Sequence, residues 1–395
     1  MTGPDLLTVL RTLQTTEVSA AEGALATFHK QPVDYINTLV KVTQTAELEV
    51  TTRQMAAVLL REALVTKPNS IFTQLPVQFK LSLKQQLPQW ILAITDTDIR
   101  RRVTECLSVY LSSLKQENQD WPELLPWLMS LSQSEHPAQR ELSYVALTRV
   151  ATLLFPAIRS NISHLRTSFS TALQDPSGEV RLAAVRALTA VVTASPEVKH
   201  VKVLRELLPQ VLTTIGHLAE ALSAQFNDNT AEALEVLLVE IAEIAELRAK
   251  FVQPMLNEFS AGMMSIAANY KLTNECRNLA LEVVILFCES LPKSIRQNPT
   301  LLRNILTLIL TLMCDIENPD DWEQLEPSNS EIDEDSVSFA SERALDRLAL
   351  SLGGLTLPPS SRTFNQTTNR TRPMEPTIRC NQRDLFNRRG MCGRD

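Results

Sequence analysis

Hydrophobic residues recur with the spacing of amphipathic helices along most of this chain. Within residues 179–192, for example, Val180, Ala184, Leu188 and Val191 follow one another at intervals of three or four residues, which places them on one face of a helix. Further apolar residues widen that face, as in a helix that packs on two sides. Prolines and short polar clusters separate one such stretch from the next, so the pattern predicts many short helices joined by turns.

The predicted helices follow one another from the first residues to about residue 353. One helix opens at Trp121-Pro122-Glu123, and two others begin near Pro32 and Pro137, where a proline at the first helical position costs little. The periodicity gives the remaining bounds as 6–13, 20–30, 33–43, 48–66, 79–94, 98–114, 137–154, 179–192, 203–224, 229–247, 250–269, 272–290, 300–316 and 341–353.

Six of these helices resemble one another, and each carries a charged residue near its start. The aligned segments are 51–64, 99–114, 138–154, 179–192, 230–244 and 275–288, and the charged residues are Arg53, Arg102, Arg140, Arg181, Glu232 and Arg277. A period of roughly 40–47 residues that contains only helices is typical of HEAT and armadillo repeats. We therefore expect an all-α, right-handed superhelical solenoid of about eight HEAT helix pairs.

In such repeats, an arginine near the start of the second helix often pairs with an acidic turn residue of a neighbouring unit. Arg181 and Asp175 are the candidates for this structural contact; the alternative is a solvated pair that adds no more than about 1 kcal/mol.

Composition supports a helical array. Glycine contributes 9 of 395 residues and aromatic residues 5%, which argues against a sheet-rich enzyme. The six cysteines form no CxxC pair, so we expect reduced and mostly buried thiols. Asp5 and Arg11 interrupt the first apolar stretch, which argues against a signal peptide. The longest apolar run, 301–314, is too short to span a bilayer, and we interpret it as a core helix.

An acidic insertion separates the last two predicted helices. From Asp315 to Glu342 the chain holds eleven acidic residues and no lysine or arginine. Such a block repels itself, so we expect a mobile anionic loop within one repeat. Trp322 is its one tryptophan, and we expect it to anchor the loop; stacking on a side chain of a bound protein is the alternative. The acids considered for binding are Asp320, Asp321, Glu323, Glu326, Glu331, Asp333, Glu334 and Asp335.

The end of the chain has a different composition. Residues 361–395 contain eight arginines, three acids and no lysine, whereas the formal charge of residues 1–360 is −12. We interpret 359–395 as a disordered, arginine-rich tail from outside the repeat array, such as an alternative exon or a shifted frame; a basic nucleic-acid arm is the other interpretation. The expected divisions are 1–115, 116–318, 319–340 (acidic loop), 341–358 (last partial repeat) and 359–395.

Several ordered segments carry a resemblance to a known family. AAEGALATFHKQPVDYINTLVKV (20–42) and the run from Arg53 to Arg61, RQMAAVLLR, resemble the N-terminal module of importin-beta (karyopherin-beta) receptors, in particular the importin beta-3 or importin-five subfamily. LVEIAE (238–243), NLALEV (278–283) and SERALDRLALSLGG (341–354) follow in the order found there. The resemblance covers about residues 5–358, the N-terminal half of such receptors.

The resemblance implies a nuclear transport receptor that shuttles between cytoplasm and nucleus. It implies that the chain binds Ran-GTP and basic cargo that carries a nuclear localisation signal. Phe-Gly nucleoporins would insert between outer helices around 158–224. The second helices 48–66, 98–114 and 137–154 would form the Ran surface, with Arg53, Arg61, Arg100 and Arg101 as candidate contacts, and the acidic loop would contact Ran or cargo. Structural or solvated arginines are the alternative.

No pattern indicates catalysis, a metal or a cofactor. The five histidines lie in different predicted repeats without a ligand at metal spacing, and no nucleotide-binding or hydrolase motif occurs. We therefore predict no catalytic residue, no metal site, no membrane partner and no direct contact with nucleic acid. Two other interpretations stay open: a truncated or isoform fragment that binds Ran without cargo, and a HEAT scaffold for protein–protein interaction without a transport function.

Overall fold

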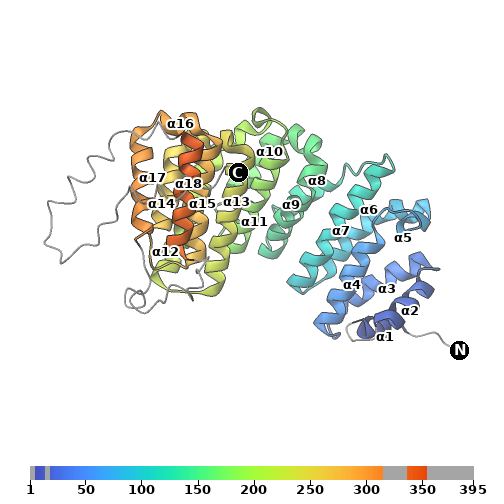
Figure 1. The fold of residues 1–395 in the computed structure, drawn as a ribbon. Coiled ribbons are helices and arrows are strands. Elements are labelled where there is room, and N and C mark those ends of the chain that lie inside the picture. The colour runs from blue at the N-terminus through green and yellow to red at the C-terminus, as the bar shows by residue number, and fades with distance from the viewer. Residues whose placement is uncertain (1–4, 14–17, 315–335, 354–395) are drawn as a thin grey trace, which may run out of the picture. The chain divides into compact units, whose positions relative to one another are not determined.

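The computed structural model describes residues 5–13, 18–314 and 336–353, and within these ranges every regular element is a helix (Figure 1). Residues up to Ser351 belong to one compact unit. The elements are α1 (Leu6–Thr12), α2 (Val18–Phe28), α3 (Pro32–Gln44), α4 (Val50–Ala63), α5 (Ile71–Gln74), α6 (Val77–Ala93), α7 (Thr97–Gln116), α8 (Leu124–Leu131), α9 (Pro137–Ser160), α10 (Ile162–Ala172), α11 (Gly178–Ala194), η1 (Val198–Leu207), α12 (Leu208–Ala224), α13 (Asp228–Val252), η2 (Gln253–Met255), α14 (Leu256–Ala267), α15 (Asn274–Ser290), α16 (Pro292–Arg296), α17 (Pro299–Leu312) and α18 (Val337–Leu352).

In the described part of the chain seven pairs of helices pack and follow one another, which confirms the predicted HEAT-type array. The first and second helices of these pairs are α1 and α2, α3 and α4, α6 and α7, α8 and α9, α10 and α11, α12 and α13, and α14 and α15. After them come α17, which packs on α14, and α18, whose Arg347 forms ion pairs with Glu282 and Glu289 of α15. From α4 onward the second helices pack on one another in chain order, α4 on α7, α7 on α9, and so on to α15. They form one continuous layer, on which the candidate site lies.

The core of the array is the apolar face that the sequence predicts. Val180, Ala184, Leu188 and Val191 of α11 are each no more than 2% exposed. Burying a large aliphatic side chain contributes about 1.5–3 kcal/mol, so each second helix is held mainly by its two neighbours.

Helix starts also follow from the local sequence. Prolines begin α3 and α9, at Pro32 and Pro137. The side chains of Asp96, Asn227 and Thr273 accept hydrogen bonds from free N–H groups in the first turns of α7, α13 and α15. These caps fix where the turn between the two helices of a pair ends.

Some helix bounds differ from the prediction. Helix α13 runs to Val252 but is kinked at Arg248, whose guanidinium binds the carbonyls of Thr193 and Ser195 at 3.1 and 2.9 Å. Beyond the kink lies η2, so α14 begins at Leu256 and not near residue 250. Helix α18 begins at Val337, four residues before the predicted start. At the kink the side chain of Arg248 contacts the preceding repeat. The hydrophobic periodicity of one helix does not reveal such a contact.

One helix of the described chain, α9, is long and apolar enough to cross a membrane by length and composition. In the array 61% of its apolar window is buried against other helices. The eight acids of the loop from Asp320 to Asp335, together with Trp322, and the arginine-rich tail 359–395 lie outside the described residues.

Candidate protein-binding groove

A groove of about 1120 Å³ runs along the layer of second helices. It crosses α4, α7, α9, α11 and α13, and it also reaches α12. Charged side chains dominate its polar lining: Asp98, Arg101, Arg102, Glu105, Glu141, Arg149, Glu179, Arg181, Arg186 and Glu232. A long, polar depression of this kind suits an extended polypeptide better than a compact metabolite.

Arginines at the starts of the second helices hold the array together beside this groove. Arg53 of α4 is 3% exposed; it donates to the carbonyl of Thr43 at 3.3 Å and lies 3.4 Å from the carboxylate of Asp96 in the next repeat. Arg100 of α7 binds the carbonyls of Ile94 and Thr95 in its own turn. The residue equivalent to Arg140 and Arg181 in this repeat is therefore Arg100, and the sequence alignment on Arg102 was wrong by two residues.

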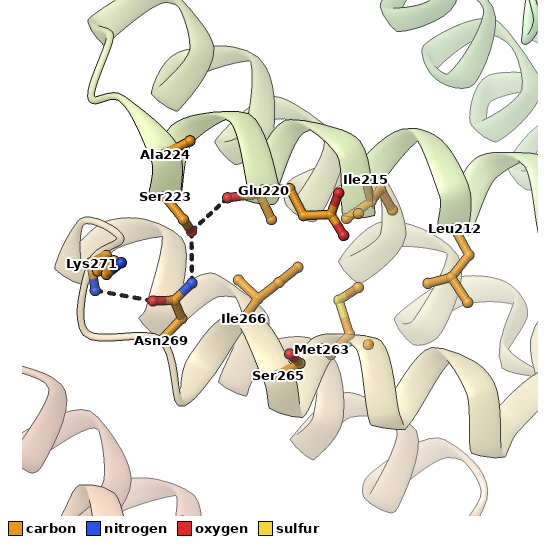
Figure 2. Close-up of a pocket in the computed structure, with 13 residues that line it drawn as sticks. Leu212, Ile215, Glu220, Ser223, Ala224, Met263, Ser265, Ile266, Asn269 and Lys271 are labelled. Carbon is orange, nitrogen blue, oxygen red and sulfur yellow. Dashed lines mark hydrogen bonds between the residues drawn. The ribbon is translucent and has the colours of Figure 1, made fainter.

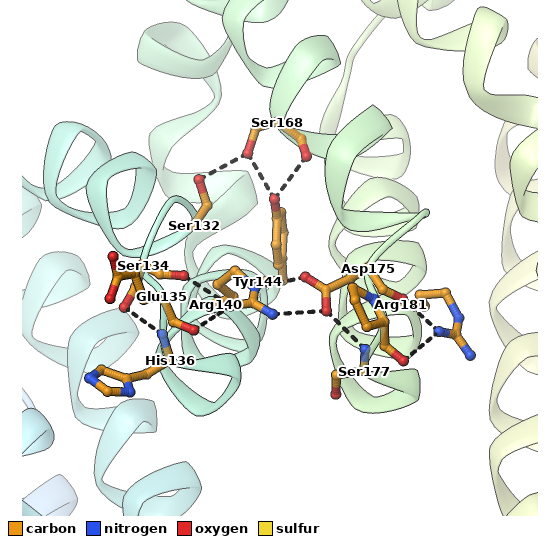
Figure 3. A network of polar contacts seen from close by, with 11 residues as sticks. Ser132, Ser134, Glu135, His136, Arg140, Tyr144, Ser168, Asp175, Ser177 and Arg181 are labelled. Carbon is orange, nitrogen blue, oxygen red and sulfur yellow. Dashed lines mark hydrogen bonds and ion pairs between the residues drawn. The ribbon is translucent and has the colours of Figure 1, made fainter.

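The best-formed of these contacts joins α9 to the turn before α11 (Figure 3). Arg140 donates to both carboxylate oxygens of Asp175, at 2.7 and 3.0 Å, and also to the carbonyls of Ser134 and Glu135. Arg181 does reach Asp175, but through its main-chain carbonyl at 2.6 Å. The predicted pair of Arg181 and Asp175 is thus a main-chain contact, and the carboxylate belongs to Arg140 of the preceding repeat.

A buried tyrosine extends this network. The hydroxyl of Tyr144 donates to the carbonyl of Ser168 at 3.0 Å and lies 2.8 Å from its hydroxyl, which in turn donates to Ser132 (Figure 3). Burial raises the pKa of Tyr144, although hydrogen bonds from both serines oppose that rise. The tyrosine therefore stays neutral and acts as a fixed donor between α9 and α10.

Ion pairs also connect neighbouring second helices of this layer. Arg61 of α4 and Arg149 of α9 both approach Glu105 of α7, at 2.8 and 3.6 Å. Arg101 of α7 binds Glu141 of α9 at 2.5 Å. Arg186 of α11 and Glu240 of α13 form a further pair at 3.2 Å, and burial raises the pKa of Glu240.

The structure separates the four arginines predicted to contact Ran into two kinds. Arg53 is buried and Arg100 is partly buried, and both donate to main-chain carbonyls. Arg61 and Arg101 expose 47% and 48% of their side chains, although each forms an ion pair. Both of these exposed arginines present charge at the surface of the second-helix layer, and Arg101 also lines the groove.

The sequence alone did not identify the acidic partners of Arg61 and Arg101, nor Arg102 and Arg149, as residues of the groove. Glu105, Glu141 and Arg149 lie within predicted helices, where charge suggested only a solvated face. A signal existed: Glu105 lies 44 residues after Arg61, and Glu141 lies 40 residues after Arg101, which is one repeat in each case. Arg102 is exposed in the groove and forms no ion pair in the described part of the chain.

A second depression, of about 500 Å³, lies between the first helices α12 and α14 (Figure 2). Ile215, Ala219, Met263 and Ile266 supply apolar walls, and Gly216 leaves open space where a side chain would project. At one end Asn269 donates to the hydroxyl of Ser223 at 2.7 Å. Among the described residues no group of three or more potential metal ligands comes together.

The stacked helix pairs define the class of a HEAT-type helical-repeat protein. Three family models match successive parts of the chain: the importin-beta N-terminal domain over residues 21–93, the IPO5-like TPR repeats over 95–261, and the importin repeat over 269–359. The chain belongs to the importin-beta (karyopherin-beta) family and is similar to its importin beta-3 and importin-5 members.

Curated relatives show the same likeness over part of their length. Importin subunit beta-3 of Saccharomyces cerevisiae is 24% identical over 348 residues, which cover 85% of this chain and 31% of the relative. The probable importin-5 homolog of Dictyostelium discoideum is 25% identical over 352 residues, or 86% of this chain and 31% of the relative. The chain therefore spans about a third of the length of these relatives.

Solved structures agree on the fold. The crystal structure of Kap121p has a TM-score of 0.75 and 24% identity over 93% of this chain and 34% of that chain. Kap121p bound to RanGTP gives a TM-score of 0.74, with 23% identity and the same coverage. At this level of identity the likeness shows a shared helical-repeat fold.

Proposed function

We propose that this chain forms part of a nuclear transport receptor that binds Ran-GTP and cargo and shuttles between cytoplasm and nucleus. The observation that carries the proposal is the array itself: three importin models follow one another over one continuous layer of second helices. Kap121p, which shares the fold, has been crystallised with RanGTP, with Nup53p and with Ste12p.

The Ran surface that we propose lies on α4 and α7. Val50, Gln54, Val58 and Arg61 follow at intervals of three or four residues and form one face of α4. Val50 and Val58 are 49% and 40% exposed, which is unusual for valines within an otherwise well-packed helix layer. An apolar strip flanked by an arginine suits a protein partner. Arg101 of α7 would extend this surface. Arg53 and Arg100 would not contact the partner and would instead hold α4 and α7 in place through their main-chain hydrogen bonds.

For cargo, we propose the groove along α7, α9, α11 and α13. Its charged lining is balanced, with five acids and five arginines, so a net negative field does not explain attraction for a basic signal. Glu179 and Glu232 are exposed and form no ion pair within the described chain. These two carboxylates are the groove positions best able to receive lysine or arginine side chains.

The pocket between α12 and α14 is our proposed contact for Phe-Gly nucleoporins. It lies between two first helices, and half of it falls within the region 158–224 predicted from the resemblance. Its apolar walls suit a phenylalanine ring, and polar groups such as Ser223 and Asn269 at its end could bind the adjoining main chain.

The direct test is a pull-down of the chain with Ran loaded with a non-hydrolysable GTP analogue, in parallel with GDP-loaded Ran. Binding to the GTP form alone is the expected result. Equal binding to both forms, or to neither, would leave the chain as a HEAT scaffold or an inactive fragment and would overturn the proposal.

A further inference from the structure

Four successive connections between one helix pair and the next, taken with the adjoining helix ends, carry a concentration of positive charge. They are residues 159–166, 195–207, 248–256 and 291–299, and we call them together the basic edge. They contain nine lysines and arginines against two glutamates, in a protein whose formal net charge is −7. This edge is separate from the groove and from the pocket between α12 and α14 described above.

Direct contacts show that the four connections are neighbours in space. Arg166 pairs with Glu206 at 2.9 Å, which joins the first connection to the second. Arg205 and Arg248 join the second to the third, because they bind the carbonyls of Phe251 and Ser195 at 3.1 and 2.9 Å. Gln253 donates to Ser294 at 3.0 Å and so joins the third to the fourth. The basic edge is therefore one continuous surface.

Local pairing leaves most of this charge uncompensated. Glu206 is engaged by Arg166, and Glu197 is engaged by Lys199 at 2.7 Å. Both glutamates of the edge are therefore already paired with a cation of the edge, and neither neutralises a second one. Arg205 and Arg248 donate to carbonyl oxygens, which leaves their formal charge intact.

Three lysines of the edge are free to bind a partner. Lys202, Lys250 and Lys293 are exposed, one on each of three successive connections, and their side-chain ammonium groups form no hydrogen bond or ion pair with a described residue. Arg159 is also exposed on the first connection and forms no ion pair there. The edge thus offers one free cation for each repeat.

We propose that the basic edge binds an extended acidic segment of another protein. Packed helices lie about 8–10 Å apart, so the free cations recur at roughly that spacing, and four connections span about 30 Å. An extended chain rises about 3.3 Å per residue. A carboxylate at every third residue therefore recurs at about 10 Å, and a segment of about ten residues reaches all four connections.

The side chains of the edge favour a peptide over nucleic acid. Single-stranded nucleic acids are held largely by stacking on aromatic side chains. Among Phe, Tyr and Trp, these four fully described connections contain only Phe251, which is completely buried. Charge with regular spacing and without a stacking surface is what an acidic polypeptide requires.

The test uses a fluorescently labelled twelve-residue peptide with glutamate at every third position and glycine or serine between. Its binding to the full 395-residue chain is measured by anisotropy at low salt. A second peptide of identical composition, with its glutamates clustered at one end, tests the spacing. The edge variant is K202E/K250E/K293E. The matched control, K30E/K41E/K67E, changes the net charge equally at exposed lysines elsewhere.

The spaced peptide is expected to bind better than the clustered one, and the edge variant to weaken it about tenfold or more, since three favourable exposed pairs become repulsive. The control variant is expected to change binding less than about threefold. Equal losses in both variants, or no loss in the edge variant, would overturn the proposal. Tighter, edge-dependent binding of a single-stranded oligonucleotide would replace the proposed partner class. Ran-GTP binding by the edge variant, measured in parallel, keeps this result distinct from the transport proposal.

Discussion

Arg140 of α9 donates two hydrogen bonds, of 2.7 and 3.0 Å, to the carboxylate of Asp175 in the next repeat. Asp175 in turn accepts from the N–H of Ser177 at 2.9 Å, so one carboxylate fixes both the neighbouring repeat and its own turn. The side chain of Asp175 is 6% exposed and that of Arg140 18%. This ion pair, with both partners largely buried, therefore ties one helix pair to the next.

Replacing Asp175 by alanine is expected to destabilise the array by roughly 2–4 kcal/mol, because it leaves a largely buried guanidinium without its charge partner. Urea unfolding followed by circular dichroism measures the change. Glu206→Ala removes an exposed ion pair with Arg166 and serves as the control, with an expected loss below about 1 kcal/mol. Similar losses in both variants would show that Asp175 has no special role.

The contribution of Asp175 should also depend on pH. Burial alone would raise the pKa of Asp175, but hydrogen bonds from Arg140 and Ser177 and nearby positive charges outweigh it and lower the pKa below 3.8. A depressed folded-state pKa means that the stabilisation is complete above about pH 5 and is lost as the pH falls through the unfolded and then the folded value. The stability difference between the wild type and Asp175→Ala is expected to stay constant from pH 8 to 5 and to shrink below pH 4. A difference that stays unchanged at pH 3 would contradict this.

Thiol reactivity should distinguish the described cysteines. Burial raises the pKa of Cys106 and Cys288 to about 12 and that of Cys276 to about 11, and all three are buried, whereas Cys314 is exposed. The thiolate is the reactive form. At pH 8 an alkylating reagent is expected to modify Cys314 within minutes and the other three only after unfolding, as read by peptide mass spectrometry. Rapid modification of Cys276 in the native protein would show that the second-helix layer opens.

The two glycines that line the pocket between α12 and α14 should differ in how their replacement by alanine changes the stability of the protein. A Cβ atom at Gly216 would meet nothing within 4 Å, whereas at Gly262 it would lie 3.0 Å from Leu212 Cδ1. Gly216→Ala is expected to stabilise α12 by about 0.5–1 kcal/mol, the usual gain for glycine within a helix. In Gly262→Ala the displacement of Leu212 should cancel most of that gain. Equal stabilisation in urea unfolding would contradict the packing argument.

A larger residue at the same position tests the nucleoporin proposal. Gly216→Leu is expected to fill the pocket between α12 and α14 and to weaken a Phe-Gly peptide, while Gly216→Ala leaves room for the ring. Binding measured by anisotropy at matched protein stability separates the two effects. Unchanged binding in Gly216→Leu would move the Phe-Gly contact elsewhere.

Charge reversal of Arg61 tests the proposed Ran surface. Arg149 remains beside Glu105 in Arg61→Glu, so Glu105 keeps one of its two arginine partners. We expect this variant to weaken binding of Ran-GTP by about tenfold, in the range of a substantial interface residue. Arg303→Glu, an exposed arginine of α17, provides the control with the same charge change. Equal effects of the two variants would point to a general charge effect.

The repeat architecture follows from the sequence alone. Apolar residues at helical spacing and proline at helix starts are local features, so they predicted the ends of α3, α4, α7, α11 and α15 to within three residues. Local features also placed Arg53, Arg140, Arg181 and Arg277 near the starts of second helices, where all four donate to main-chain carbonyls at the end of the first helix or in the turn that follows it. The helices of a repeat can therefore be located from the apolar face and the helix ends of that repeat alone.

Which charges meet depends on the tertiary structure. Arg61 and Glu105, Arg101 and Glu141, and the members of the basic edge lie about a repeat or more apart in the chain, and their meeting depends on the rotation of each helix pair against the next. The same packing separates four similar arginines into two that bind main-chain carbonyls and two whose side chains are exposed. Helical periodicity fixes which face of a helix is buried, but the register between stacked helices is set by side-chain packing, which no single repeat contains.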